Sequence, residues 1–151
     1  MLGNRVRDPQ ALEGCATEAE GLGLLDIETE MTPEKIVRNI EARSAEHDIA
    51  LTGYEIHLGV SQGADCARPM TILDGRPDGA VSPDGKVSGT YLHGLFDSDA
   101  YRAKLLSEFG IRGGETNFRA DVDRALDDLA AELDRLVGFE RLMSTSALIG
   151  R

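Results

Sequence analysis

The sequence predicts an α/β fold, and three observations support this prediction. Residues 49–60 alternate in hydropathy along most of their length, which is the pattern of a strand with two different faces. Residues 86–92 form a β-branched and aromatic run that reads as a second strand, and residues 97–99 (DSD) then offer side-chain acceptors for the first turn of a helix. Residues 118–137 carry apolar side chains at three- and four-residue steps, as amphipathic helices do. His93 therefore stands between a strand and a helix, where open α/β sheets bind ligands.

Composition limits the classes of function. The chain has 151 residues, of which 41% are hydrophobic and 28% charged, as expected for one globular domain. Its net charge of −11 argues against nucleic acid and against anionic membrane surfaces as partners. The apolar runs are short, and the N-terminus lacks an apolar signal core. Cys15 and Cys66 form neither a disulfide framework nor a zinc-binding pattern. We expect an acidic, cytoplasmic, single-domain protein without a metal site.

The first part of the chain is predicted as follows. Residues 1–6 read as the last turn of a helix, and residues 8–21 as a loop rich in acidic and small side chains. Residues 22–29 form a short apolar run that passes into alternation, which predicts a strand. Residues 35–42 fit a helix that begins near Pro33 as well as they fit an edge strand, and propensity does not decide between the two.

The second part gives clearer signals. Residues 70–73 are predicted as a short strand, and residues 80–82 and 86–92 flank an Asp-Gly turn that indicates a hairpin. Residues 98–109 predict a helix with one apolar stripe, and the long helix over residues 118–137 has the most regular pattern in the chain. Each of these helices is followed by a glycine, which favours a helix end.

Three segments resemble one family. Residues 89–96 (GTYLHGLF), residues 53–59 (GYEIHLG) and residues 78–85 (DGAVSPDG) are similar to the glutamine amidotransferase domain of cobyric acid synthases. The resemblance implies an enzyme of cobalamin biosynthesis that is an ATP-dependent amide ligase. Such enzymes amidate corrinoid side-chain carboxylates with ammonia taken from glutamine.

The resemblance also implies a fold and an extent. The fold is the class I glutamine amidotransferase-like α/β fold, a flavodoxin-like open sheet. It favours a strand for residues 35–42, paired with residues 49–60 through a turn at residues 45–48. Residues 1–151 would be the C-terminal portion of the amidotransferase domain, so we expect an N-terminally truncated domain without the nucleophile elbow or the synthetase domain.

His93 is the candidate catalytic residue. A histidine in a strand-to-helix loop is more often structural than catalytic, but Gly89 and Gly94 allow a close backbone approach on either side. The resemblance implies that His93 is the base that deprotonates a cysteine thiol in glutamine hydrolysis. Many type I amidotransferases orient this histidine with an acidic residue two positions later, where this chain has Leu95. Cobyric acid synthases resemble this chain in lacking the acid, so what orients His93 is left open.

Tyr54, Glu55 and His57 are candidate substrate-binding residues. In the alternating strand, Tyr54, Ile56 and Leu58 share one face, and Glu55 and His57 share the other. One interpretation of Glu55 and His57 is a solvated sheet face. The other is a polar wall of the glutamine pocket, which the resemblance favours.

The expected nucleophile is missing from the sequence. The family places its catalytic cysteine in a Gly-x-Cys-Gly-Gly pattern, and these residues contain none. Cys15 lies in an acidic loop, and Cys66 lies outside any strand–turn–helix context, with Arg68 favouring and Asp65 opposing its thiolate. We expect both cysteines to be incidental and the isolated chain to be inactive. No ATP-binding loop pattern is present, so ATP and Mg²⁺ are expected only with the synthetase domain.

Two alternatives remain open. One is a related amidotransferase of the cell-wall precursor lipid II, which shares the Gly-Tyr/Phe-Glu-x-His pattern but less of residues 89–96. The other is a non-catalytic amidotransferase-like module that binds a partner or small ligand. For a truncated sheet we also expect an exposed hydrophobic face and self-association through it.

Overall fold

The computed structural model describes residues 1–112, 117–138 and 143–144, and it divides the chain into two units. The first unit is Met1–Arg112 and holds all described strands and one α-helix. The second unit is Gly113–Arg151 and holds the long helix. Each unit is described by itself.

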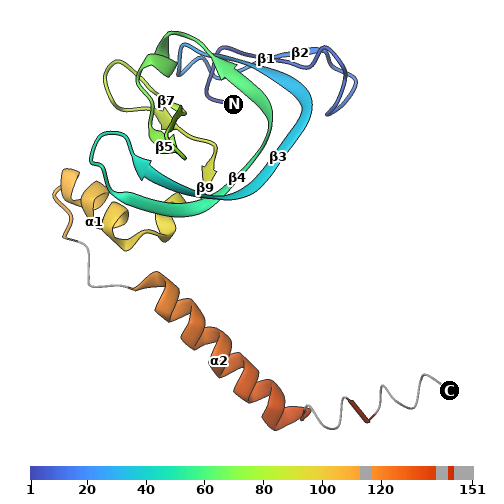
Figure 1. The fold of residues 1–151 in the computed structure, drawn as a ribbon, viewed down its shortest axis with the longest axis vertical. Coiled ribbons are helices and arrows are strands. Elements are labelled where there is room, and N and C mark those ends of the chain that lie inside the picture. The colour runs from blue at the N-terminus through green and yellow to red at the C-terminus, as the bar shows by residue number, and fades with distance from the viewer. Residues whose placement is uncertain (113–116, 139–142, 145–151) are drawn as a thin grey trace. The chain divides into compact units, whose positions relative to one another are not determined.

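A long antiparallel hairpin forms the centre of the first unit. Strand β3 (Glu28–Ser44) pairs with β4 (Ala50–Gln62), and the pair curves around the shorter strands (Figure 1). The predicted strand over residues 35–42 and its turn are therefore confirmed. Pro33 lies inside β3 where the register with β4 shifts, between Met31 and Ile36. A bulge at this point tolerates a residue that cannot donate a backbone hydrogen bond, so the proline does not start a helix.

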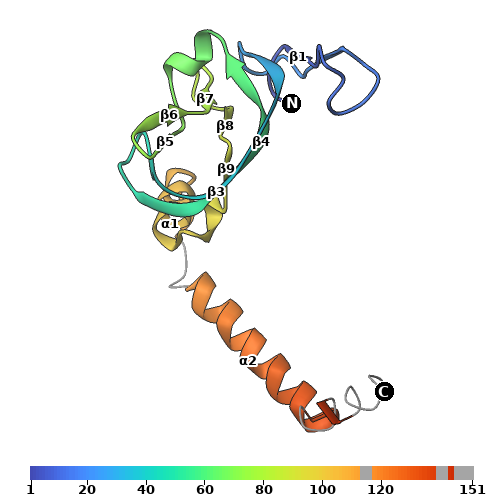
Figure 2. The same cartoon turned by 45° about the vertical axis from the view of Figure 1, so that its right-hand side comes forward.

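Short strands extend the sheet that contains the hairpin, and two further strands form a second, small sheet (Figure 2). The larger sheet is mixed, because β1 runs parallel to β3 while β3 and β4 are antiparallel. Its order is β2-β1-β3-β4-β9, and β5 pairs with both the far end of β3 and β6. A second, two-stranded sheet joins β7 to β8. The bounds are β1 Arg5–Arg7, β2 Glu18–Glu20, β5 Thr71–Leu73, β6 Arg76–Asp78, β7 Ala80–Val81, β8 Ser88–Gly89 and β9 Leu92–His93.

The structure corrects three predictions for the N-terminal segment. Residues 1–6 are not the end of a helix, since β1 begins at Arg5. Residues 8–21 include strand β2, and residues 22–27 are not a strand. The backbone amides of residues 22–25 instead donate to carbonyls of residues 1–3, and Gly23 adopts a left-handed φ of 64°. This tight turn buries Leu25, while Leu22 and Leu24 are exposed.

The hydrophobic core lies on the concave side of the curved hairpin. It combines side chains of β3, β4, β5 and β9 with residues that follow β9. Its buried members are Ile40, Leu51, Leu73, Leu92, Leu95 and Tyr101. The predicted strand at residues 70–73 and the Asp-Gly hairpin are confirmed as β5 and as β7 with β8.

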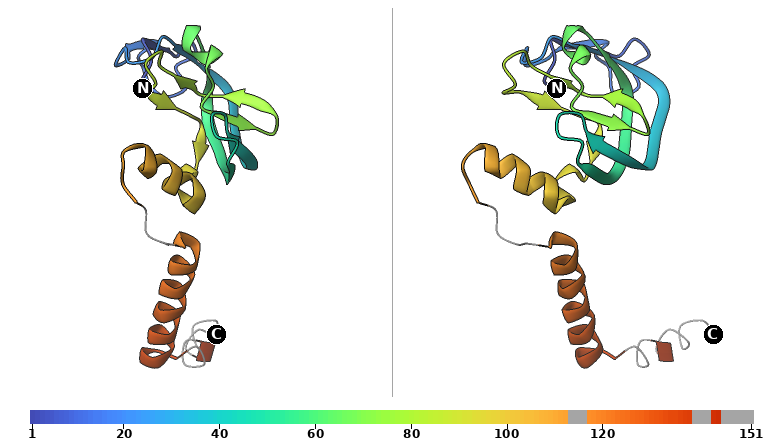
Figure 3. Two further views of the ribbon diagram at one scale, coloured as in Figure 1. Left: turned by 90° about the vertical axis from the view of Figure 1, so that its left-hand side faces the viewer. Right: turned by 60° about the vertical axis from the view of Figure 1, so that its left-hand side comes forward.

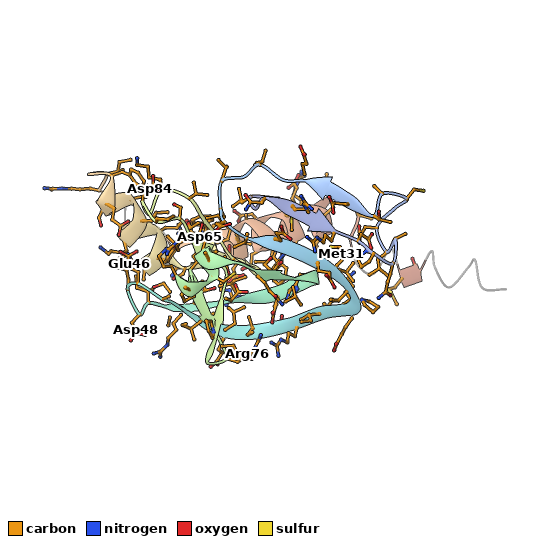
Figure 4. The ribbon with its side chains drawn as sticks, turned by 90° about the horizontal axis from the view of Figure 1, so that it is seen from above. Met31, Glu46, Asp48, Asp65, Arg76 and Asp84 are labelled. Atoms are coloured by element: carbon orange, nitrogen blue, oxygen red, sulfur yellow. The ribbon has the colours of Figure 1, made fainter. Side chains whose placement is uncertain are left out.

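Helix α1 (Asp99–Glu108) closes one end of this core (Figure 3). Ser98 caps its first turn by accepting from the amide of Tyr101, and Gly110 follows its end with a left-handed φ of 72°. The predicted helix is confirmed. Figure 4 shows Glu46 and Asp48 in the β3–β4 turn on the side of this helix, where His47 bonds Glu108 at 2.8 Å.

Helix α2 (Phe118–Leu136) is the described helix of the second unit and confirms the longest predicted helix. Asn117 caps its start, and Gly138 follows its end with a φ of 72°. Its apolar stripe is exposed within the unit and consists of Phe118, Val122, Leu126, Leu129, Leu133 and Leu136. Among the described residues, no helix has the length and apolar character needed to cross a membrane.

Candidate active site

His93 ends strand β9 and has an exposed side chain. The chain turns sharply after it, because Gly94 adopts a left-handed φ of 84°. A 3₁₀ turn (Leu95–Asp97) and helix α1 follow at once. The structure therefore places His93 before a helix, as the sequence predicts, but as the last residue of a strand. The predicted continuous strand over residues 86–92 is wrong: the run is divided into β8 and β9, which belong to different sheets, because Asp78 binds Thr90 and the amide of Tyr91 between them.

Tyr54 of β4 is the cross-strand partner of His93. The two rings are stacked, with centroids 5.0 Å apart and planes 6° from parallel. Tyr54 is itself 44% exposed, so the pair stands on an open face of the sheet. Among the residues that the structure describes, no side chain forms a hydrogen bond with the imidazole of His93. The ring contact that the structure gives for this imidazole is the stack on Tyr54.

Gly53 lets β4 approach β9, the strand that ends at His93, closely. A Cβ atom at this position would lie 2.0 Å from the backbone oxygen of His93 and 3.1 Å from a methyl group of Leu92. A backbone oxygen cannot move aside as a flexible side chain can, so any side chain here would displace β9. Gly53 thus maintains the register that brings Tyr54 and His93 together.

Leu95 occupies the position where many type I amidotransferases carry an acid. Its side chain is 7% exposed and belongs to the core cluster with Leu51, Leu92 and Tyr101. The backbone after His93 therefore directs the second following residue into the core and away from the imidazole. This geometry explains why the position is apolar in this chain.

Glu55 lies on the opposite, concave face of β4 and is 1% exposed. Its Oε2 accepts from Arg38 at 2.8 Å and from Arg76 at 3.2 Å, and its Oε1 lies 2.9 Å from Nε2 of His57. Burial acts to raise the pKa of Glu55, but the hydrogen bonds from His57 and Arg38 and the charges of the two arginines outweigh it and hold the pKa below its usual value. Glu55 is therefore an ionised, fully bonded buried carboxylate.

His57 extends this network toward Tyr91, which directly precedes β9. Its Nδ1 lies 2.7 Å from the backbone oxygen of Gly59, and its ring stacks on Tyr91 with centroids 4.1 Å apart. The hydroxyl of Tyr91 bonds Ser61 at 2.6 Å. We call this set the brace; its members are Arg38, Glu55, His57, Ser61, Arg76 and Tyr91.

Asp78 fixes the residues just before β9. Its Oδ2 accepts from the hydroxyl of Thr71 at 3.1 Å, from the hydroxyl of Thr90 at 2.5 Å and from the amide of Tyr91 at 3.0 Å. Sequence reasoning missed Asp78 along with Arg38, Arg76 and Tyr91, because their partners are distant in sequence. Their signal is weak: charged and aromatic residues near strand ends are common on ordinary surfaces.

The predicted division of β4 into two faces is confirmed. In a half-buried strand the apolar face is usually buried and the polar face exposed, but in this part of β4 the two are reversed. The polar residues Glu55 and His57 face the protein interior, while Tyr54 and Ile56 face outward. The interpretation of Glu55 and His57 as a solvated face is therefore wrong. The assignment of Tyr54, Glu55 and His57 to glutamine binding stays a prediction.

Neither cysteine is a member of the brace, although Cys66 lies next to Ser61. Cys15 is exposed in the loop before β2. Cys66 lies in a 3₁₀ turn (Ala64–Ala67) after β4, with its Sγ 3.8 Å from the backbone oxygen of Ser61. Burial, then the charges of Asp65 and Asp78, raise the pKa of the Cys66 thiol, which disfavours a thiolate. Among the described residues, no three His, Cys, Asp or Glu side chains gather as metal ligands.

Comparisons with known proteins identify the family. The model of the CobB/CobQ-like glutamine amidotransferase domain matches residues 1–101. The chain is 62% identical over 135 residues to the cobyric acid synthase of Rhizobium etli, a match that covers 89% of this chain and 28% of the relative. For the cobyric acid synthase of Sinorhizobium fredii the identity is 63% over 134 residues, with 89% and 28% covered.

The chain thus spans about 28% of the length of these curated relatives. The match agrees with the mixed α/β structure, and the predicted class I glutamine amidotransferase-like fold is confirmed. The resemblance found in residues 53–59, 78–85 and 89–96 is confirmed as well, because the matched region includes all three segments. The chain belongs to the CobB/CobQ-like glutamine amidotransferase family.

Proposed function

We propose that this chain supplies the histidine of a glutamine amidotransferase site in a longer cobyric acid synthase. In that protein, ammonia released from glutamine would serve the ATP-dependent amidation of corrinoid side-chain carboxylates in the cytoplasm. ATP and Mg²⁺ would act in the synthetase part of the protein. The similarity to cobyric acid synthases supports this assignment.

His93 is the proposed base and acid. It takes the proton of a cysteine thiol, and the thiolate sulfur forms a bond to the side-chain carbonyl carbon of glutamine. The imidazolium then gives its proton to the departing nitrogen, so the carbon–nitrogen bond breaks and ammonia leaves. In the second half, His93 takes a proton from water, and the resulting hydroxide forms a bond to the thioester carbon while the carbon–sulfur bond breaks. Glutamate leaves, and the imidazolium returns its proton to the thiolate, which restores the thiol.

The observation that carries the proposal is the open apolar face around His93. We call it the histidine face; it consists of Val37, Tyr54, Ile56 and His93, which are neighbours by strand pairing. Its side chains are exposed although its centre is apolar, whereas the charged Glu55, which lies between Tyr54 and Ile56 on β4, is buried. Such a face favours contact with another part of a protein, and a base placed on it would meet a nucleophile carried by that part.

The nucleophile is proposed to be neither Cys15 nor Cys66. The raised pKa of the Cys66 thiol opposes a reactive thiolate, and Cys15 lies in an exposed loop with acidic neighbours. We therefore expect negligible release of ammonia from glutamine by the 151-residue chain.

A hybrid enzyme tests the proposal. This chain replaces the matching segment of the Rhizobium etli cobyric acid synthase, and amidation is measured with glutamine and, separately, with ammonium as nitrogen donor. We expect the hybrid to use both donors, and the His93→Asn variant to use ammonium alone, because only glutamine hydrolysis requires the base.

The ammonium reaction is the control for folding of the synthetase part. If His93→Asn leaves glutamine-dependent amidation intact, His93 is not the base and the non-catalytic module is the better description. If the 151-residue chain alone hydrolyses glutamine, one of its own cysteines is the nucleophile and the proposal is wrong.

A further inference from the structure

The orientation of His93 needs a source other than an acidic side chain. The position of the usual acid holds Leu95, which is buried in the core. No side chain among residues 1–112, 117–138 and 143–144 hydrogen-bonds the imidazole. An exposed histidine without a partner samples several rotamers, and this loses part of the rate that a positioned base provides.

We propose that Tyr54 is the positioning residue of His93, a statement that rests on the proposed function. The aromatic ring covers one face of the imidazole, with the planes 6° from parallel and the centroids 5.0 Å apart. Stacking restricts rotation about the side-chain bonds of His93 and leaves both ring nitrogens free at the ring edge. One nitrogen can then meet a thiol, which a histidine bonded at both nitrogens could not do.

The backbone around the pair is arranged for this contact. Tyr54 and His93 are direct partners in the pairing of β4 with β9, and directly opposed residues bring their side chains together on one face. Gly53 permits the approach of the strands, since a Cβ there would collide with the backbone oxygen of His93. Gly94 then turns the chain away with a φ of 84°, so the residues after His93 leave this face.

Residues on the buried face of β4 and β9 fix the two strands that carry the stacked rings. The neighbouring pair in the same ladder is Glu55 with Leu92, and both are buried on the concave face. Glu55 is fixed by Arg38, Arg76 and His57. The strand under Tyr54 is therefore held rigidly, and the ring it presents is a stable platform for the imidazole.

A ring is required for this role and a hydroxyl is not. Tyr54→Phe keeps the stack, whereas Tyr54→Leu keeps an apolar side chain of smaller size and removes the stack. In the hybrid enzyme we expect kcat with glutamine to fall roughly tenfold in Tyr54→Leu with KM nearly unchanged, since a stacked aromatic pair corresponds to a factor of about ten at most. Tyr54→Phe is expected to restore most of kcat.

A direct structural readout uses the 151-residue chain with isotope-labelled histidine. Stacking on an aromatic ring shifts the imidazole proton signals of His93 by its ring current. Tyr54→Leu should abolish this shift and Tyr54→Phe should keep it. His57 is an internal control, because its ring stacks on Tyr91 and its signals should not change in either variant. The signal of His93 is assigned with His93→Asn.

The outcomes separate this inference from the proposed function. Loss of glutamine-dependent amidation in His93→Asn together with an unchanged kcat in Tyr54→Leu overturns the positioning role and leaves the proposed function intact. A raised KM with unchanged kcat would make Tyr54 a glutamine-binding residue instead. A drop in kcat in Tyr54→Phe as large as in Tyr54→Leu would assign the effect to the hydroxyl and overturn the inference as well.

Discussion

Leu95 shows how a single residue can be excluded from a catalytic role by its surroundings. Its side chain packs in the core beside Leu92 and Tyr101, although it follows the candidate base by two positions. We expect Leu95→Asp to lower the free energy of unfolding by about 3 kcal/mol or more, because a carboxyl group would replace a buried aliphatic side chain. Denaturant unfolding measures this. Leu95→Met is the control and should cost less than about 1.5 kcal/mol.

An opposite result would change the description of the site. If Leu95→Asp were as stable as the unmodified chain and raised the glutaminase rate of the hybrid, the position would face the imidazole. The backbone path would then permit an acid at position 95, and its absence would be a feature of this sequence alone.

The ionisation of the single residue Glu55 makes the free energy of unfolding depend on pH. Its pKa is below the usual value of 4.5, so its ionisation contributes stability that is present above pH 4.5 and is lost as the pH falls through the lowered pKa. We expect Glu55→Gln to destabilise the chain by about 2 kcal/mol at pH 7, because the two arginines lose a charged acceptor.

The measurement is the free energy of unfolding of both proteins between pH 3 and pH 7. The difference should shrink at the acidic end, where the unmodified chain also carries a neutral side chain at this position. Glu34→Gln, on the exposed edge of β3, is the matched control and should change stability by less than about 0.5 kcal/mol. A difference that is the same at every pH would rule out the ionised network.

At the scale of elements, the pairing of β4 with β9 depends on Gly53. A Cβ at this position would lie 2.0 Å from a backbone oxygen, so Gly53→Ala must shift one of the strands. We expect a loss of roughly 2 kcal/mol or more and faster amide hydrogen exchange at Leu92 and His93. Gly89→Ala is the comparison, because its Cβ would meet a single flexible methyl group of Leu2 at 3.1 Å.

Equal stability of the two glycine variants would mean that β9 is not held against β4 in solution. The stacked pair of Tyr54 and His93 would then lack the backbone support on which its geometry depends.

At the scale of the whole molecule, the net charge opposes association between molecules, whereas the exposed apolar residues of the histidine face favour it. The net charge of −11 keeps molecules apart at neutral pH, and repulsion disappears near the pI of 4.6. Val37 and Ile56 are exposed partners in the middle of the face. We expect the 151-residue chain to self-associate more strongly at pH 5 than at pH 7.5, which sedimentation velocity can measure.

Substitutions identify the surface responsible. Ile56→Glu should reduce the association at pH 5, since it places a charge on the histidine face. Leu22→Glu changes an apolar residue that is more exposed than Ile56 (68% against 37%) but lies in a loop outside this face, so it should have little effect. If Leu22→Glu reduced association as much as Ile56→Glu, a different surface would be responsible.

The sequence by itself determined the features that depend on neighbours along the chain. These are the position of His93 before a helix, the side-chain acceptors at residues 97–99 for the first turn of that helix, the alternation of β4 and the extent of both helices. Such features follow from backbone preferences and side-chain periodicity, which act within a few residues. The family motif around His93 belongs to the same scale.

Tertiary structure alone decided which face of β4 is buried and what surrounds His93. Periodicity divides a strand into two faces but does not say which one faces the core, and here the curvature of the β3–β4 hairpin encloses the polar face. The brace joins Glu55 to Arg38 and Arg76, which lie 17 and 21 residues away in sequence. Such partners cannot be read from local pattern, because their contact depends on the path of the whole sheet.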